Sequence, residues 1–203
     1  MDFVTITKFA IKGKSPFYEM YCKDKKVLDL ACGDGSFLKN DKKNIIGLDN
    51  NDAMIERAAK SNMKILKGDL RDKLPFEDAA FDVVHNANVI EHLTPYEAYF
   101  MLKEIARVLK TNGVLILSTE LATQKIWWTF SHERPYPPEC LRKIFSDDAN
   151  ETFPPLKMLK LKKVFYNGRY CKFLPLAFFF KSVAFFLPIF RRSYVAIIRK
   201  QLV

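Results

Sequence analysis

The feature that most constrains the fold of this chain is a short apolar run leading into two closely spaced glycines. The run Val27–Leu30 precedes Gly33 and Gly35, and the next apolar run, Ile45–Asp49, ends in an acid. A strand, a glycine turn, a helix-like segment and a second strand ending in a carboxylate form half of a nucleotide-binding α/β unit. Glycine lets the backbone approach a ligand closely, and the Asp49 carboxylate can accept hydrogen bonds from both hydroxyls of a ribose.

The glycine turn also indicates which nucleoside it accepts. A dinucleotide-binding turn would have a third glycine where this chain has Leu38, and it would bring an anionic pyrophosphate next to Asp34. A carboxylate is a poor neighbour for a phosphate but a tolerable one for a sulfonium cation. The turn therefore favours S-adenosylmethionine (SAM) over NAD.

Further motifs follow in order along the chain: Gly68–Leu70, Phe81–Asn86 with Val89–Leu93, and Leu109–Ser118. Together with the glycine turn, Asp29–Gly35, their order and spacing resemble those of class I SAM-dependent methyltransferases, the seven-stranded Rossmann-like kind that acts on small molecules. The resemblance runs from about Lys25 to Phe145 and returns more weakly at Tyr194–Lys200. Ala31 stands where the family usually has its first glycine.

The resemblance implies an α/β fold, a Rossmann-like three-layer sandwich. Its sheet would be mostly parallel and seven-stranded, with an antiparallel final strand and an apolar helical insertion before that strand. Alternation of strands and helices favours a parallel sheet with crossover helices. The strands are expected at Val27–Leu30, Ile45–Asp49, Met63–Lys67, Phe81–Asn86, Val114–Ser118, Met158–Tyr166 and Tyr194–Ile198. The helices are expected at Ala53–Ser61, Pro95–Leu109 (with Thr94 as its N-cap) and Pro138–Phe145.

The chain divides into an N-terminal arm or lid, residues 1–24, and a methyltransferase domain, residues 25–203, with a basic apolar insertion at about 167–193. Its net charge of +10 is concentrated at one end, because residues 152–203 hold 11 Lys and Arg and no acid. The four cysteines are scattered and predict reduced thiols in a cytoplasmic protein. No secretory signal is expected at the N-terminus.

The resemblance implies a set of residues that bind SAM and its product, S-adenosylhomocysteine. Gly33 and Gly35 would bring backbone to the methionine half, and Asp49 would hold the ribose. Asp29 would position the methionine ammonium, or would instead cap amides of the loop, and Asp69 would contact the exocyclic amine of adenine. The full cofactor set is Asp29, Ala31, Gly33, Gly35, Asp49, Asn50, Met54, Asp69, Leu70, Asn86 and Ala87.

Methyl transfer from a sulfonium mainly requires that the acceptor is aligned with the methyl group and that water is excluded. A general base is needed only when the accepting atom starts out protonated. The candidates are His92, after the fourth strand, and His132, in a stretch similar to the family's His-x-Arg-x-Tyr segment. The alternative for His92 is a helix-start or packing residue, and the alternative for His132 is a surface loop with internal hydrogen bonds. The predicted acceptor-binding residues are Glu91, Trp127, Trp128, Arg134 and Tyr136. The histidines show no metal-ligand spacing, so no metal site is expected.

The segment Phe173–Phe190 is almost wholly apolar. The twelve residues between Pro175 and Pro188 would form roughly 18 Å of helix, against a hydrocarbon core of about 30 Å. Spanning is also disfavoured because the final strand must return to the sheet. Two interpretations are favoured: a helical cap packed on the domain or on a second copy in a homodimer, and an interfacial helix on an anionic membrane surface through residues 172–192. A true span or a re-entrant hairpin is the remaining alternative.

The leading hypothesis is methyl transfer to a small, hydrophobic or lipid- or glycan-linked acceptor by a cytoplasmic, peripheral membrane enzyme. One alternative is an RNA methyltransferase that uses the basic C-terminal quarter. It is disfavoured because Asn86 is followed by Ala87-Asn88-Val89 and not by the Pro-Pro-Tyr/Phe that base N-methylation usually needs. Another alternative is a SAM-binding interaction protein without catalysis.

Overall fold

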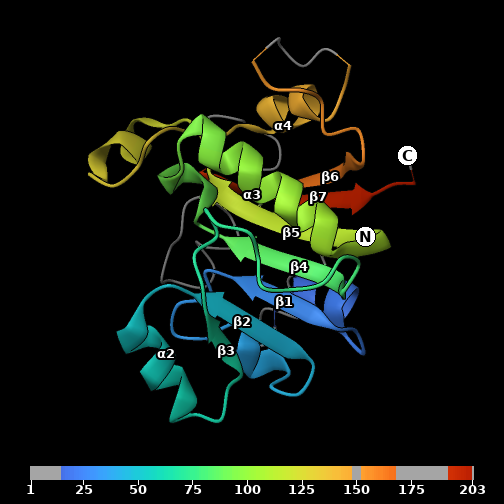
Figure 1. Cartoon of the computed structure of the whole chain (residues 1–203). Helices are drawn as coiled ribbons and strands as arrows, with labels where there is room; N and C mark the ends of the chain where they lie inside the picture. Colours follow the sequence, from blue (N-terminus) through green and yellow to red (C-terminus); the bar gives the residue numbers. More distant parts are fainter. Residues whose placement is uncertain (1–14, 148–151, 168–191, 203) are drawn as a thin grey trace, which may run out of the picture.

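A computed structural model describes residues 15–147, 152–167 and 192–202 of the chain. Its core is a seven-stranded sheet in the order β3-β2-β1-β4-β5-β7-β6 (Figure 1). The strands are β1 (Val27–Leu30), β2 (Ile45–Asp49), β3 (Ile65–Lys67), β4 (Phe81–Ala87), β5 (Leu109–Glu120), β6 (Leu159–Asn167) and β7 (Ser193–Lys200). The helices are α2 (Asp52–Ala59), α3 (Pro95–Val108) and α4 (Pro138–Ile144), with short turns η1 (Tyr18–Cys22), η2 (Leu38–Asn40), η3 (Ile90–His92) and η4 (Gln124–Trp128).

The directions of the strands confirm the predicted architecture. β1 pairs in parallel with β2 and β4, β2 with β3, and β4 with β5. β7 is antiparallel to both of its neighbours, β5 and β6. The final strand of the chain is therefore inserted into the sheet against the direction of the others, as predicted.

The apolar side chains form two clusters, one on each face of the sheet. In β5, Leu115 and Leu117 belong to one cluster, and Val114 and Ile116 belong to the other. Successive side chains of a strand point to opposite faces, so a run that is apolar at every position must be covered on both sides. Helix α3 covers the first face, while η1 and η2 contribute to the cluster on the second (Figure 1). The sheet and the elements that cover its two faces form the three predicted layers.

Helix α3 begins as predicted. The Thr94 side chain accepts from the backbone of Glu97, the Glu97 carboxylate accepts from Thr94 in return, and Pro95 follows as the first helical residue. This capping box satisfies backbone donors that a helix start leaves open. The helix ends at Val108, one residue earlier than predicted, because Leu109 already belongs to β5.

Two strands differ in length from their predictions. β3 is shorter, Ile65–Lys67 and not Met63–Lys67. β5 is longer, because pairing with β4 begins at Leu109 and resumes at Val114 after an irregularity. Asn112 has a positive φ of 65° inside that irregularity. The residues between Leu109 and Val114 are therefore a bulge within the strand.

Some predictions fall on residues outside the described ranges. These are most of the N-terminal arm, residues 1–14, and the apolar insertion with Phe173–Phe190 and Cys171. In the described part of the chain, no helix combines the length and the apolar character needed to cross a membrane.

Candidate active site

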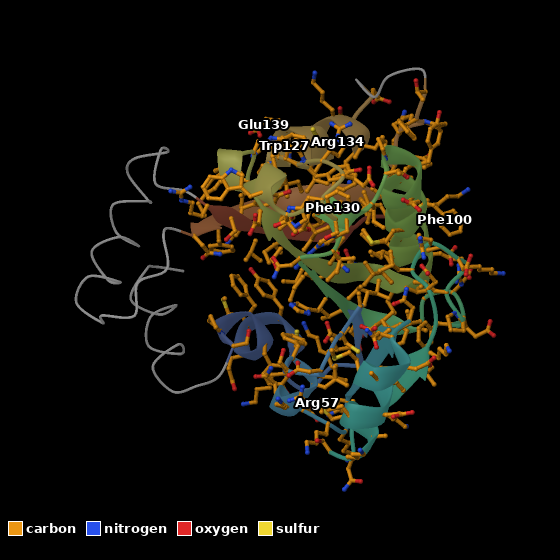
Figure 2. All side chains as sticks on the ribbon, turned by 90° about the vertical axis from the view of Figure 1, so that its left-hand side faces the viewer. Arg57, Phe100, Trp127, Phe130, Arg134 and Glu139 are labelled. Atoms are coloured by element: carbon orange, nitrogen blue, oxygen red, sulfur yellow. The ribbon has the colours of Figure 1, made fainter. Side chains whose placement is uncertain are left out.

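The predicted cofactor residues lie at the carboxyl ends of the parallel strands. β1 is flanked by β2 and by β4, so the chain order reverses direction between β1 and β4. Ligands of open α/β sheets bind at such a switch point, outside the carboxyl ends of the strands. This edge is on the left of Figure 1 and faces the viewer in Figure 2.

The loop after β1 uses three residues with a positive φ, Ala31 (51°), Gly33 (53°) and Gly35 (72°). A β-carbon added to Gly35 would come within 2.7 Å of the sulfur of Met63. A β-carbon added to Gly33 would meet no atom within 4 Å. Gly35 therefore packs against the end of the Met63 side chain inside the protein, whereas Gly33 faces open space of the kind that a ligand needs for a close approach to the backbone.

Asp49, at the end of β2, is buried and fastens the glycine loop. Its Oδ2 accepts from the amide of Gly33 at 2.7 Å, and its Oδ1 accepts from the amide of Asn51 at 2.9 Å. An ionised carboxylate has about four acceptor positions. One position on each oxygen therefore remains for a diol, which is the arrangement that the predicted ribose contact requires.

Asp69, after β3, has a carboxylate that is already engaged. The Arg71 side chain donates to both of its oxygens, at 3.0 and 2.6 Å, and the Arg71 backbone amide donates to Oδ1 at 2.9 Å. The side-chain amide of Asn50 donates to Oδ2 at 3.2 Å. The hydrogen bonds from the Arg71 side chain hold the pKa of Asp69 well below its usual range. Arg71 has no place in the predicted set. Nothing in the sequence, apart from its position two residues after Asp69, indicates that Arg71 pairs with that carboxylate.

Asp29, at β1, is 3% exposed and lies beside a histidine of the neighbouring strand. His85 Nδ1 lies 2.6 Å from Asp29 Oδ1, and the ring of Phe37 stacks on the imidazole with centroids 3.7 Å apart. Asp29 thus has a partner within the protein. The predicted contact with a methionine ammonium stays a prediction.

Asn86 and Ala87 end β4. The side chain of Asn86 is fully buried, and its amide nitrogen donates to the carbonyl of Leu30 at 3.2 Å. Its Oδ1 has no hydrogen-bond partner within the described part of the chain. Met54 lies in the first turn of α2, where it is half-buried.

A cavity of about 360 Å³ brings several predicted residues together at this edge. Five members of the predicted cofactor set line it: Ala31, Asn50, Asp69, Leu70 and Ala87. His92 lines it too, with Val89, Leu93 and two residues that the sequence did not single out, Arg71 and Asn88. The open space above Gly33, the free positions of Asp49 and this cavity fit a nucleoside with an attached amino acid, so the residues present suit SAM.

Glu91, His92 and His132 meet beside this cavity. One ligand-type atom of each side chain lies within 4.8 Å of those of the other two. The Nδ1 atoms of His92 and His132 contact backbone carbonyls of Ser131 and Ile126, at 3.0 and 2.8 Å. The structure thus brings together two predicted catalytic residues and one predicted acceptor-binding residue.

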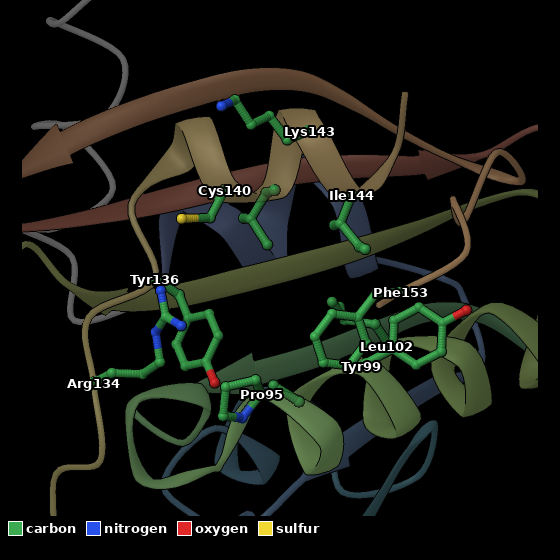
Figure 3. A pocket seen from close by; sticks show the side chains of 11 residues that line it. Pro95, Tyr99, Leu102, Arg134, Tyr136, Cys140, Lys143, Ile144 and Phe153 are labelled. Carbon is green, nitrogen blue, oxygen red and sulfur yellow. The ribbon is translucent and has the colours of Figure 1, made fainter. Parts of the chain in front are cut away.

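The remaining predicted acceptor residues separate into two groups. Tyr136 and Arg134 line a second cavity, of about 290 Å³, between α3 and α4 (Figure 3). Burial raises the pKa of Tyr136 to about 12, and its hydroxyl donates to the carbonyl of Leu93 at 2.8 Å. Trp127 and Trp128 are 61% and 73% exposed and do not line this cavity.

The fold and the site define a Rossmann-like nucleoside-binding protein, and comparisons with known proteins agree. Residues 28–117 match the model of a methyltransferase domain. A probable SAM-dependent methyltransferase of Mycolicibacterium smegmatis is 31% identical over 135 residues, which are 64% of this chain and 50% of that protein. A sterol 24-C-methyltransferase of Aspergillus fumigatus is 37% identical over 101 residues, 44% of this chain and 26% of that protein. The chain thus spans half or less of the length of these two curated relatives.

Among solved structures, a SAM-dependent methyltransferase from Archaeoglobus fulgidus shares the fold with a TM-score of 0.68. It is 21% identical, and the match covers 98% of this chain and 99% of that one. Residues 28–117 are thus similar to a methyltransferase domain, and the chain has the fold of class I SAM-dependent methyltransferases. SAM is the cofactor that this family and this fold imply, as predicted.

Proposed function

We propose that this chain transfers a methyl group from SAM to a small acceptor that is hydrophobic or linked to a lipid or a glycan. The observation that carries the proposal is the cavity at the carboxyl edge of the sheet. Asn50 and Asp69, which follow β2 and β3, line it together with Val89 and His92, which follow β4. Cofactor-type and acceptor-type residues thus share one space.

Bound SAM supplies a methyl carbon that its positive sulfur activates for in-line attack. The residues of the chain then have to hold the two reactants in line and keep water out. Asp49 and the glycine loop fix the nucleoside end, while the apolar side chains of Val89 and Leu93 line the cavity. A backbone carbonyl can only accept, so Nδ1 of His92 and of His132 carries a hydrogen and each Nε2 can accept a proton.

The apolar character of the acceptor is supported by the second cavity and by one relative. Tyr99, Leu102 and Ile144 line that cavity with Tyr136 (Figure 3). The hydroxyl of Tyr136 donates to the backbone carbonyl of Leu93, and Leu93 lines the first cavity. A residue of the second cavity is therefore in direct contact with a residue of the first. The Aspergillus fumigatus relative is named for a sterol, an apolar acceptor.

A position at the cytoplasmic face of a membrane is the second part of the proposal. The excess of basic residues beyond residue 152 favours an anionic surface. Three large aromatic side chains of one segment are exposed, namely Trp127, Trp128 and Phe130. Exposed aromatic rings and an excess of basic residues are both typical of proteins that bind at the level of lipid headgroups. A homodimer in which the apolar insertion packs on a second copy is the competing proposal for that segment.

The experiment is a transfer assay with methyl-labelled SAM and three fractions of cell extract: lipid, glycan and RNA. Label in the lipid or glycan fraction, lost with Asp49→Ala, is the expected result. Label confined to RNA would replace the proposal with a nucleic-acid methyltransferase. SAM binding without label in any fraction would leave a SAM-binding protein without catalysis.

A further inference from the structure

The cluster of Glu91, His92 and His132 combines two imidazoles and a carboxylate from segments that are forty residues apart in sequence. η3, directly after β4, supplies the first two side chains, and the loop after η4 supplies the third. The amides of Glu133 and Arg134 donate to the carbonyl of Glu91, at 2.9 and 3.4 Å. The backbone itself therefore ties the two segments together at this point.

Both imidazoles are oriented by hydrogen bonds of the kind that hold metal ligands. His92 Nδ1 contacts the carbonyl of Ser131, and His132 Nδ1 contacts the carbonyl of Ile126. Each Nδ1 must donate, so in the neutral ring the lone pair is on Nε2. A backbone carbonyl at the second nitrogen fixes the tautomer and the orientation of metal-binding histidines in many proteins.

Glu91 is 1% exposed, yet its side chain is a carboxylate. The hydroxyl of Thr119 donates to its Oε2 at 2.8 Å. Among the described residues, no lysine or arginine forms an ion pair with it. A buried carboxylate is stabilised when it is paired or bound to a metal, so a cation bound here would supply a partner that the described ion pairs do not.

We infer that Glu91, His92 and His132 form a binding site for one divalent cation of the Zn²⁺, Mn²⁺ or Co²⁺ type. Two imidazole nitrogens and a carboxylate oxygen suit such ions. Ligands bonded at ~2.1 Å to one ion lie within ~4.2 Å of each other, so the 4.8 Å spread needs only a small adjustment. The amino-acid spacing did not predict this site, because its third member is brought in by the loop after β5.

The site has positions left for a further ligand, because three protein ligands do not complete the coordination of such an ion. His92 also lines the cofactor cavity, so the open positions lie beside the place where an acceptor would enter. The ligand there would be an acceptor oxygen, a hydroxyl above all, whose pKa a bound cation lowers. This role rests on the proposed function. With the cation bound, the Nε2 lone pairs hold the ion and do not act as bases, so the proton leaves to solvent, the O–C bond forms as the C–S bond breaks, and the neutral thioether departs.

The test is titration of chelator-treated protein with Co²⁺, followed by its visible d–d absorption, with Zn²⁺ as competitor. We expect one cation per chain, and binding at least ~10-fold weaker in His92→Ala and in Glu91→Gln. His92 is exposed, so its replacement leaves the fold intact even if Glu91→Gln does not fold. Glu133→Gln, which changes an exposed acid beside the site, should bind like the wild type.

Folded wild type without saturable Co²⁺ or Zn²⁺ binding would overturn the site, and so would unchanged affinity in His92→Ala. SAM binding, measured in parallel by calorimetry, separates this outcome from failure of the proposed function. SAM binding without Co²⁺ binding removes only the cation site. Co²⁺ binding that depends on His92, without SAM binding, supports the cation site and removes the methyltransferase function.

Discussion

At the scale of single residues, the site depends on a few groups whose protein contacts leave part of their bonding capacity open. Asp49 is the clearest example, because amides occupy one position on each of its oxygens. Asp69 is the opposite case, because Arg71 and Asn50 together supply two donors to each of its oxygens. An adenine amine would have to displace one of these donors. The sequence predicts a contact with SAM for both acids, but it does not show that the Asp69 carboxylate is already hydrogen-bonded by neighbouring side chains.

Replacing Asp49 should weaken SAM binding strongly. Loss of charged hydrogen bonds costs about 1.5–3 kcal/mol, so Asp49→Ala should raise the Kd for SAM by roughly 10- to 100-fold. Asp52→Asn is the matched control, because Asp52 is an exposed acid at the start of α2 that pairs with Lys67. Calorimetry on both variants measures the difference. Equal affinity in Asp49→Ala and the wild type would remove Asp49 from the site.

The two glycines of the loop should respond differently to alanine. Both have a positive φ, so both substitutions carry a backbone cost of about 1 kcal/mol. Gly35→Ala adds a clash with Met63 and should lower the thermal midpoint further. Gly33→Ala meets no protein atom and should lower SAM affinity more than stability. Thermal melts with and without SAM check both effects, and the reverse ranking would contradict the ligand position above Gly33.

At the scale of elements, the fold was predictable where the pattern of apolar residues is regular. Runs such as Ile45–Asp49 and Tyr194–Ile198 became strands close to their predicted bounds. β5 begins at Leu109 and not at the predicted Val114, because the structure accommodates Asn112 and Gly113 as a bulge in one long strand. The cation cluster was not predictable, since the position of His132 follows from a loop without periodicity.

Side chains of α3 form a hydrogen-bond network that holds the backbone at Leu74 and Phe76, in the segment that leads into β4. The Glu104 carboxylate accepts from the amide of Leu74 at 2.9 Å and from Arg107 at 2.7 Å. Arg107 also donates to the carbonyls of Leu74 and Phe76. The Arg107 guanidinium holds the pKa of Glu104 below its usual value.

This network makes stability depend on pH. A lowered folded-state pKa stabilises the protein above the unfolded value, about 4.3, and this contribution is lost as the pH falls below it. Glu104→Gln should therefore cost about 1–3 kcal/mol at neutral pH, and less at acidic pH. Glu77→Gln, an exposed acid nearby, should have no such effect. Denaturant unfolding at several pH values measures the difference, and a cost that stays constant with pH would contradict the ionic role of Glu104.

At the scale of the whole molecule, the chain joins a nearly neutral body to a basic, aromatic C-terminal quarter. Residues 1–151 carry 22 Lys and Arg against 23 Asp and Glu, and residues 152–203 carry only the 11 basic ones. Nine of the 18 phenylalanines also lie in this last part. Such an asymmetry influences where the protein binds and not how its sheet is built.

The protein should bind vesicles in a charge-dependent manner. We expect flotation with anionic vesicles that weakens with added salt, because the attraction of basic residues to headgroups is screened. Replacing Trp127 and Phe130 by serine should weaken it further, whereas Leu202→Ser, which changes another exposed apolar residue, should not. Equal flotation with neutral and anionic vesicles, or none with either, would contradict the membrane proposal.

The most direct test of the whole account is calorimetric titration of the purified chain with SAM, S-adenosylhomocysteine and NAD. The geometry of the loop after β1, the free positions of Asp49 and the cavity beside them predict micromolar or tighter binding of the first two, on the order of −8 kcal/mol, and none of NAD. A folded protein that binds NAD, or that binds neither SAM nor S-adenosylhomocysteine, would contradict the assignment of this site.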